Sequence, residues 1–170
     1  PLPRIDVCMD TLNGAQYFST LDLRSGYWQL QLEPESSEKT AFVTRKGVWK
    51  FNVLAFGLSN APALFQRLMD LVLAGLTWQV CLAFLDDIII MSTTFEQHLE
   101  RLALVFDRLK KANLKLHPDK CNLFREEVRF LGSVVSKEGI APDPEKVKAV
   151  EEWPVPRTLT ECRGFVARSE

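Results

Sequence analysis

Two short apolar runs near the middle of the chain surround a pair of acidic residues. Residues 80–85 and 88–91 are rich in Val, Ile and Phe, and each run is too short for a buried helix. They therefore predict the two β-strands of a hairpin, with Asp86 and Asp87 at its tip. Adjacent carboxylates in this setting fit either a solvated turn, where Asp is common, or a site that holds a cation.

A third acidic residue lies near the end of an earlier predicted strand. Residues 17–23 alternate loosely and carry β-forming side chains, Asp22 comes late in the run, and Ser25-Gly26 ends it. If this strand and the hairpin are neighbours in one sheet, Asp22 meets Asp86 and Asp87. Such a cluster of acids suits Mg²⁺, and two ions roughly 3.5–4 Å apart would form the clamp used in phosphoryl transfer.

The segment after residue 56 combines a loop of small residues with a helical repeat. Gly57, Ser59 and Asn60 predict the loop, and Pro62 fits the first turn of the helix. The apolar face of this helix comprises Phe65, Leu68, Met69, Val72 and Leu76. A small-residue turn that opens a helix leaves free backbone N–H groups, which favour phosphates.

A second helix is predicted to begin near Thr94, because residues 93–96 form a capping box. Its apolar stripe comprises Phe95, Leu99, Leu102, Phe106 and Leu109. His98 lies off this stripe and is expected at the solvated surface. Lys120 follows the turn at Pro118-Asp119, and its position alone predicts a solvated side chain.

The rest of the pattern completes a mixed architecture. We expect the end of a short helix at residues 9–14, a short strand at 114–116 and one alternating strand at 128–136. Prolines then punctuate two short helical segments, at 144–153 and from about Leu159. The predicted fold class is α+β, with an antiparallel sheet covered on one face by the helices that begin near Pro62 and Thr94.

Composition narrows the class of protein. The 170 residues are 46% hydrophobic and 25% charged, as in soluble globular domains. No apolar run approaches the roughly 20 residues that span a bilayer, and we see no leader, so neither membrane contact nor secretion is expected. The four cysteines form no CxxC pair, which argues against a zinc site and favours an intracellular, reducing compartment.

Charge argues mildly against a free-standing nucleic-acid-binding protein. The net charge is −1 and the pI is near 6.2, whereas such proteins are usually basic. Residues 39–50, however, contain no acid, and their cations are interleaved with Phe42 and Trp49. The cations are Lys39, Arg45, Lys46 and Lys50. This segment fits either contact with a phosphate backbone or the solvated face of a hairpin that turns at Lys46-Gly47.

The ordered motifs of the chain resemble those of reverse transcriptases, most closely those of gypsy-type LTR retrotransposons. The resemblance extends to about Thr158 and runs through PLPRID, YFSTLDLRSGYWQL, KTAF, FGLSNAPALFQRLM, FLDDIII, HLERL, LKLHPDKC, VRFLGSVVSKEGI and DPEKVKAVEEWPVPRT. It implies a polymerase palm at residues 1–136, with a fingers-type hairpin at about 31–53. Residues 137–170 would be the connector and the truncated start of a thumb.

The resemblance implies template-directed nucleotidyl transfer, with deoxynucleoside triphosphates as substrates and a primed RNA or DNA template. Asp22 and Asp86 would hold two Mg²⁺ ions, for which Mn²⁺ can substitute. Asp87 would be a less direct ligand, the backbone carbonyl of Leu23 a further one, and Lys120 a general acid for the departing pyrophosphate.

Further roles follow from the same resemblance. The residues implied to bind the nucleotide are Ser25, Gly26, Tyr27, Phe56 and Gly57. Those implied to contact primer or template are Phe84, Leu85, Asn60, Pro62, Phe130, Leu131, Gly132, Lys39, Arg45 and Lys46. Tyr27 would lie under the sugar and exclude a 2′-hydroxyl, although its sequence context fits a packed tyrosine equally well.

Three departures from the family pattern bear on activity. Phe84 stands where the family usually has Tyr, for which a modest effect on incorporation is expected. The chain begins after the fingers segment that grips the triphosphate, and it lacks most of a thumb. RNase H and integrase regions are expected in the full polyprotein, together with an intracellular, cytoplasmic location in a virus-like particle.

Two other classes of function remain open at this point. A two-metal nuclease could use the same three acids, but it would not explain Tyr27, FGLSNAP and the Phe130-Leu131-Gly132 run. An inactive or domesticated fragment could act as a nucleic-acid-binding or interaction module, although the retained acids count against it.

Overall fold

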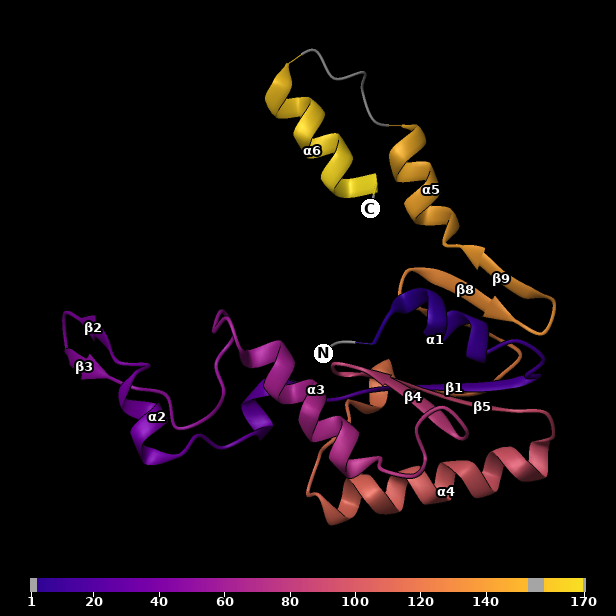
Figure 1. Cartoon of the computed structure of the whole chain (residues 1–170), viewed down its shortest axis with the longest axis horizontal. Coiled ribbons are helices and arrows are strands. Elements are labelled where there is room, and N and C mark those ends of the chain that lie inside the picture. Colours follow the sequence, from indigo (N-terminus) through magenta and orange to yellow (C-terminus); the bar gives the residue numbers. More distant parts are fainter. Residues whose placement is uncertain (1–2, 153–157, 170) are drawn as a thin grey trace.

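A four-stranded sheet in the order β4-β5-β1-β6 forms the centre of the molecule (Figure 1). The computed structural model describes residues 3–152 and 158–169. The strands of the sheet are β1 (Tyr17–Asp22), β4 (Cys81–Phe84), β5 (Asp87–Ser92) and β6 (Asn122–Arg125). All three ladders are antiparallel. The predicted strand that carries Asp22 and the predicted hairpin that carries Asp86 are therefore neighbours, and the α+β class is confirmed.

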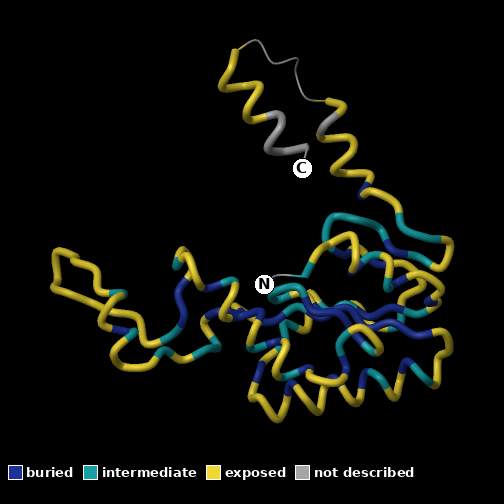
Figure 2. The backbone as a smooth tube through the Cα atoms, viewed as in Figure 1, coloured by how far each residue is buried: buried dark blue, intermediate teal, exposed yellow. Residues whose placement is uncertain are grey.

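Both faces of this sheet are buried, because successive side chains of a strand point to opposite faces. Ile88 and Ile90 of β5 lie in one apolar cluster with residues of α3 (Ala61–Val72) and α4 (Phe95–Lys111). Ile89 lies in a second cluster with residues of α1 (Ile5–Thr11) and of a three-stranded sheet. The central strands are accordingly the most buried part of the trace (Figure 2). The helices thus cover one face as expected, and α1 with the second sheet covers the other.

The three-stranded sheet corrects one prediction. Residues 128–136 were expected to form a single strand, but they form β7 (Glu127–Phe130) and β8 (Ser133–Ser136), joined by a turn. Leu131 and Gly132 adopt φ angles of +47° and +77°, which reverse the chain between the two strands. The alternation in the sequence continues through the turn and therefore concealed it.

The chain then leaves this sheet through a third strand and two helices. β9 (Gly139–Pro142) pairs with β8, and α5 (Pro144–Glu151) and α6 (Leu159–Ser169) follow. Both helices confirm the segments predicted between the prolines, although Trp153 lies outside the described residues. The expected boundary between palm and connector, at residues 136 and 137, falls in the turn between β8 and β9. The two strands of one hairpin therefore lie on opposite sides of this boundary, and the boundary itself stays a prediction.

The segment between β1 and α3 extends away from the central sheet (Figure 1). It contains α2 (Pro34–Glu38) and a hairpin of β2 (Phe42–Thr44) and β3 (Gly47–Trp49). A single bridge between Gln31 and Val53 closes its base. Residues 31–53 therefore contain a short hairpin preceded by a helix, and the strands of the hairpin are exposed throughout (Figure 2).

The buried face of α4 differs from the prediction. The helix is capped as expected, since Thr94 accepts a hydrogen bond from the backbone N–H of Gln97. His98 is fully buried, whereas Phe95 and Leu99 are about half exposed, so the expectation of a solvated His98 was wrong. The buried residues of α4 are His98, Leu102, Val105 and Leu109. The imidazole can be buried because hydroxyl groups of the sheet bind both of its nitrogens.

Two 3₁₀ segments complete the described structure, η1 (Gly26–Gln29) after β1 and η2 (Pro118–Lys120) before β6. Within residues 3–152 and 158–169, no helix combines the length and the apolar character needed to cross a bilayer.

Candidate active site

Asp22 and Asp87 lie opposite each other in the β1–β5 ladder. Directly opposite residues of an antiparallel pair point to the same face, so the two carboxylates share one side of the sheet. Asp86 is the second residue of the two-residue turn between β4 and β5, directly before Asp87. Its carbonyl accepts a hydrogen bond of 3.2 Å from the backbone N–H of Leu23. Strand pairing therefore brings together three acids that are distant in the sequence.

The turn that carries Asp86 is held under strain by a glutamine that the sequence reasoning missed. Leu85 has a φ of +55°, a region that glycine favours and that side chains rarely adopt. Its N–H donates a 2.8 Å hydrogen bond to Oε1 of Gln66, and Nε2 of Gln66 donates to the carbonyl of Ala83 at 3.1 Å. The buried amide of Gln66 thus occupies the place of a neighbouring strand at the edge of β4. A polar residue inside an apolar helical repeat was its only signal in the sequence.

Burial and neighbouring charge oppose the ionisation of Asp86 and Asp87. Partial burial, followed by the charge of Asp22, raises the pKa of Asp87 above its usual value. The pKa of Asp86 is also raised, again chiefly by burial, with a smaller contribution from Asp22. The ammonium of Lys120 lies 3.7 Å from Oδ2 of Asp22 and lowers both values only in part. An excess of negative charge is therefore concentrated at one end of the sheet.

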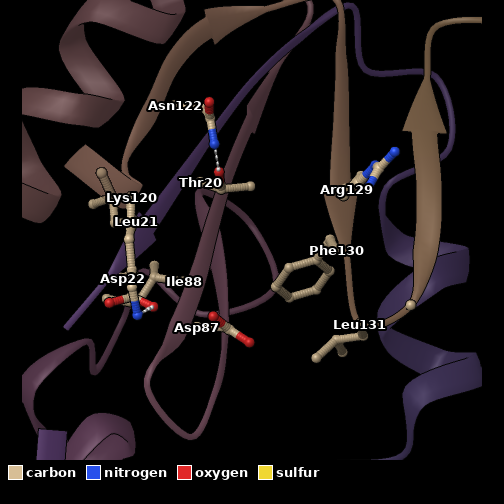
Figure 3. Close-up of a pocket in the computed structure, with 11 residues that line it drawn as sticks. Thr20, Leu21, Asp22, Asp87, Ile88, Lys120, Asn122, Arg129, Phe130 and Leu131 are labelled. Atoms are coloured by element: carbon tan, nitrogen blue, oxygen red, sulfur yellow. Dashed lines mark hydrogen bonds and ion pairs between the residues drawn. The ribbon is translucent and has the colours of Figure 1, made fainter. Parts of the chain in front are cut away.

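A pocket of about 240 Å³ lies beside these acids (Figure 3). Asp22 and Asp87 line one side, and Phe130, Leu131 and Gly132 of the β7–β8 turn line the other. Lys120 lies on the same side of the pocket as Asp22. Asn122 and Arg129 also line the pocket, although the sequence did not predict them as site residues. The structure therefore brings the predicted Phe130-Leu131-Gly132 run to the predicted acids.

Asp86 faces a different neighbour. A Cβ atom at Gly26 would lie 3.2 Å from Cγ of Asp86 and 3.0 Å from the ring of Phe65, so only glycine lets η1 approach this closely. Ser25, just before it, has a φ of +51°. Tyr27 is buried against Phe65, and burial and the charge of Asp86 raise the pKa of its hydroxyl. Ser25, Gly26 and Tyr27 therefore lie on the Asp86 side of the site.

An aromatic surface continues from Tyr27. The ring of Phe56 lies 5.1 Å from that of Tyr27 and 5.9 Å from that of Trp28, measured between centroids, and both Phe56 and Trp28 are more than half exposed. Gly57 follows with a φ of +89°. An exposed apolar surface therefore continues from Tyr27 on the Asp86 side of the site.

The other residues predicted to bind metal, primer or template lie outside the pocket. Phe84 pairs with Asp87 across the hairpin, and Leu23 is buried behind Asp22. Asn60 and Pro62 stand at the start of α3. Lys39, Arg45 and Lys46 are exposed on the β2–β3 segment, away from the acids (Figure 1). Lys50 forms an ion pair with Glu38.

The acids fit a divalent cation that also binds a substrate. In the described part of the chain, no three His, Cys, Asp or Glu side chains are grouped closely enough to hold a metal by themselves. Mg²⁺ is commonly bound by only one or two carboxylates together with substrate phosphates and water. Asp22 and Asp87 lie on one face of the sheet and the pKa of Asp87 is raised, which matches that mode of binding.

Comparison with known proteins identifies this arrangement. Residues 2–135 match the family model described as reverse transcriptase (RNA-dependent DNA polymerase). The chain belongs to the reverse transcriptase family. It is 45% identical over 166 residues to the retrovirus-related Pol polyprotein from transposon 297 of Drosophila melanogaster, and 40% identical over 166 residues to that from transposon gypsy. These alignments cover 98% of the chain and 16% of each polyprotein.

Solved structures support the same family and fold. The foamy viral protease-reverse transcriptase in complex with double-stranded DNA superposes with a TM-score of 0.88 at 28% identity, covering 99% of this chain and 30% of the other. The same viral enzyme in complex with an RNA/DNA hybrid gives a TM-score of 0.82 at 28% identity, covering 94% and 22%. The sheet that carries the acids is therefore the palm-like part of a reverse transcriptase domain.

Proposed function

We propose that the chain performs template-directed nucleotidyl transfer onto the 3′ end of a primer, as an RNA-directed DNA polymerase. The observation that carries this proposal is the pairing of Asp22 with Asp87 across β1 and β5, beside a pocket whose other side is the Phe130-Leu131-Gly132 turn. A related viral enzyme has been solved with double-stranded DNA and with an RNA/DNA hybrid, which supports a primed template as the partner.

The acids would hold the divalent cations, Mg²⁺ or Mn²⁺. Asp22, Asp86 and Asp87 would supply carboxylates and Leu23 its backbone carbonyl, with the phosphates of the nucleotide completing the coordination. Two bound ions would lower the pKa of the primer hydroxyl and stabilise the charge on the departing pyrophosphate. Burial, followed by the charge of Asp22, raises the pKa values of Asp86 and Asp87, and the uncompensated negative charge of this group supports cation binding at this place.

Lys120 would act on the leaving group. Its exposed ammonium lies 3.7 Å from Asp22, so it can reach the same phosphates that the acids help to position. A lysine in this place can donate a proton to the pyrophosphate as the bond to it breaks. Its ion pair with Asp22 holds the side chain at the site before substrate arrives.

The nucleotide would bind on the Asp86 side. Ser25 and Gly26 can present backbone N–H groups to the triphosphate, because the missing Cβ of Gly26 lets the main chain come close. Tyr27 would lie under the sugar, where its buried ring leaves no room for a 2′-hydroxyl. Phe56 and Gly57 would form the apolar edge of the same subsite.

The nucleic acid would extend from this site in two directions. Phe130, Leu131 and Gly132 would hold the primer end, with Phe84 and Leu85 of the catalytic hairpin beside it. Asn60 and Pro62 at the start of α3 would contact the template. The exposed residues Lys39, Arg45 and Lys46 would follow the phosphate backbone, with Phe42 and Trp49 between them.

The chain spans about one sixth of the length of the Drosophila polyproteins that it matches. Within this part, residues 1–136 would form a palm, and residues 137–170 a connector and the start of a thumb. The full polyprotein would also carry RNase H and integrase regions and would act in an intracellular, cytoplasmic virus-like particle.

Primer extension tests the proposed function. The chain is incubated with a labelled DNA primer on an RNA template, deoxynucleoside triphosphates and Mg²⁺ or Mn²⁺. Asp86→Asn is tested beside it, and Asp10→Asn, at an exposed position of α1, is the control. Metal-dependent extension that Asp86→Asn abolishes and Asp10→Asn retains supports a polymerase. Shortening of the primer indicates a nuclease, and binding with neither activity indicates an interaction module.

A further inference from the structure

A buried aspartate joins the pocket to the helix that follows the second sheet. Asp143 is 8% exposed, and its N–H donates a 3.2 Å hydrogen bond to the carbonyl of Gly132 in the β7–β8 turn. Its Oδ1 accepts from the N–H of Glu145 at 3.0 Å, which caps the start of α5. Its Oδ2 lies 3.7 Å from Nε of Arg129. Asp143 thus fixes the start of α5 against the turn.

This fixed start of α5 lays Lys146 across the turn. A Cβ atom built at Gly132 would lie 2.3 Å from Nζ of Lys146, 3.0 Å from Cε and 3.4 Å from Cδ, so the end of the lysine side chain occupies the space beside the glycine. Gly132 lines the pocket together with Asp22 and Asp87. The ammonium of Lys146 therefore lies beside a residue that lines the pocket, although Lys146 itself is on another element.

The cations around the pocket differ in their partners. Lys120 is paired with Asp22, and Arg129 donates a 2.9 Å hydrogen bond to Oε1 of Glu145. Lys146 forms no ion pair with any carboxylate in the parts of the chain that the structure describes. Lys148, on the same helix, lies 3.6 Å from Glu152. Of these four cations, Lys146 is thus the one whose charge is not already paired with a carboxylate in the described residues, and it is free to bind a phosphate.

We propose that Lys146 binds a backbone phosphate of the primer strand next to its 3′ end. This inference rests on the proposed function, because it takes the strand whose end reaches Asp22 and Asp87 to cross the Phe130-Leu131-Gly132 turn. A strand on that path would pass beside the ammonium of Lys146. Asp143 is the positioning residue, since it sets the direction of α5 and hence the place of Lys146.

Equilibrium binding with Ca²⁺ in place of Mg²⁺ tests the contact without relying on catalysis. The affinity of the chain for a fluorescent primer–template is measured at several salt concentrations for wild type, Lys146→Ala and Lys148→Ala. One lost phosphate contact reduces the steepness of the plot of log affinity against log salt by about 1, so the defect of Lys146→Ala should shrink about 3.5-fold between 50 and 200 mM salt. Lys148→Ala should behave as wild type, because its partner is Glu152.

A second probe locates the phosphate. Primers that carry one neutral methylphosphonate are compared, with the modified linkage moved stepwise from the 3′ end. Wild type should lose affinity at one linkage near that end, and Lys146→Ala should be insensitive at the same linkage. Asp143→Ala should give the same insensitivity, since the carboxylate that caps the start of α5 at Glu145 and lies beside Arg129 is then missing.

The outcomes separate this inference from the proposed function. Equal affinities and salt slopes for wild type and Lys146→Ala, or an equal loss in Lys148→Ala, would overturn the phosphate contact even if the chain extends primers. A chain that shows the linkage-specific effect but extends no primer with Mg²⁺ or Mn²⁺ would retain the contact and overturn the polymerase.

Discussion

Asp22 and Asp87 face each other across the β1–β5 ladder, a position in which two like charges destabilise a sheet. Asp86 stands beside them, in a turn whose preceding residue, Leu85, is itself strained. The ladder continues into a fully buried part of β5, where Ile88, Ile89 and Ile90 stabilise the sheet. The site therefore lowers the stability of the fold locally, and the burial of the three isoleucines offsets this loss.

Replacing Asp87 by Asn should make the protein more stable and less active. The substitution removes a carboxylate whose pKa is raised by burial and by Asp22, so in EDTA at neutral pH the midpoint of thermal unfolding should rise by about 1–3 °C. Added Mg²⁺ should stabilise wild type more than the variant, because the cation binds the folded state. Circular dichroism melts with and without Mg²⁺ measure both effects, and Asp10→Asn is the control. A fall in the melting midpoint in EDTA would contradict the prediction.

The gain in thermal stability of Asp87→Asn should be larger at neutral pH than at acidic pH. Because the pKa of Asp87 is raised on folding, the folded state binds more protons than the unfolded state above the ordinary value of 3.8. The penalty grows as the pH rises above 3.8 and disappears as the pH falls below that value, where both states are protonated. The difference in melting midpoint between Asp87→Asn and wild type should therefore shrink towards zero near pH 4, if the fold persists there.

Gln66 should be required for the shape of the catalytic turn. Gln66→Met keeps the length of the side chain but leaves the N–H of Leu85 and the carbonyl of Ala83 without their partner, at a cost of about 1–3 kcal/mol for each buried group left unsatisfied. We expect a lower midpoint in urea unfolding and a loss of primer extension greater than the loss of primer binding. Gln79→Met, at an exposed glutamine, should change neither. Unchanged extension by Gln66→Met would show that the turn holds its shape alone.

Local patterns in the sequence predicted the elements that carry the acids. The β4–β5 hairpin followed from two apolar runs around Asp86 and Asp87, and the strand at Asp22 from alternation and the break at Ser25-Gly26. Their meeting depends on register, which is a property of two distant segments. It was therefore a hypothesis until the ladder between β1 and β5 showed Asp22 opposite Asp87.

The misses arose where tertiary contacts override a local pattern. In α4 the most apolar stripe includes Phe95 and Leu99, yet the helix buries His98, because hydroxyl groups of the sheet satisfy its ring. Gln66 was passed over for the same reason, since its partners are backbone groups of another element. The turn at Leu131 was hidden because alternation continues through it and a leucine rarely adopts positive φ.

Tyr27 should control the choice between deoxyribose and ribose. Its ring packs against Phe65 and Phe56, which fixes it beside Asp86. Tyr27→Val should allow ribonucleotides to be incorporated, whereas Tyr27→Phe should retain the exclusion because the ring and not the hydroxyl fills the space. Single-nucleotide extension measures the ratio of the incorporation efficiency with a dNTP to that with the matching rNTP. This ratio should fall by about tenfold or more for the valine variant, as expected when about 1.4 kcal/mol of discrimination is lost. Equal ratios for valine and phenylalanine would assign the exclusion to another residue.

His98 should make the fold sensitive to mild acid. The hydroxyl of Ser92 donates to the carbonyl of Thr94, so Ser92 accepts from Nδ1–H of His98, and Nε2 accepts from the hydroxyl of Ser19. Burial, with a smaller contribution from Arg101, lowers the pKa of this neutral imidazole below the ordinary 6.5. The unfolded state then binds more protons, so the stability is complete above about pH 6.5 and is lost as the pH falls towards the folded pKa, by up to about 1.4 kcal/mol per pH unit.

Urea unfolding between about pH 5 and pH 8 tests the role of His98. Wild type should lose stability across the lower half of this range. His98→Gln cannot titrate and should show a flatter profile, at a stability lower by about 1–3 kcal/mol because a serine of the sheet loses its partner. His117→Gln, which replaces the second of the two histidines, is the comparison variant. If His98→Gln and wild type have parallel profiles, another group accounts for the acid sensitivity and the Ser19–His98–Ser92 network is purely structural.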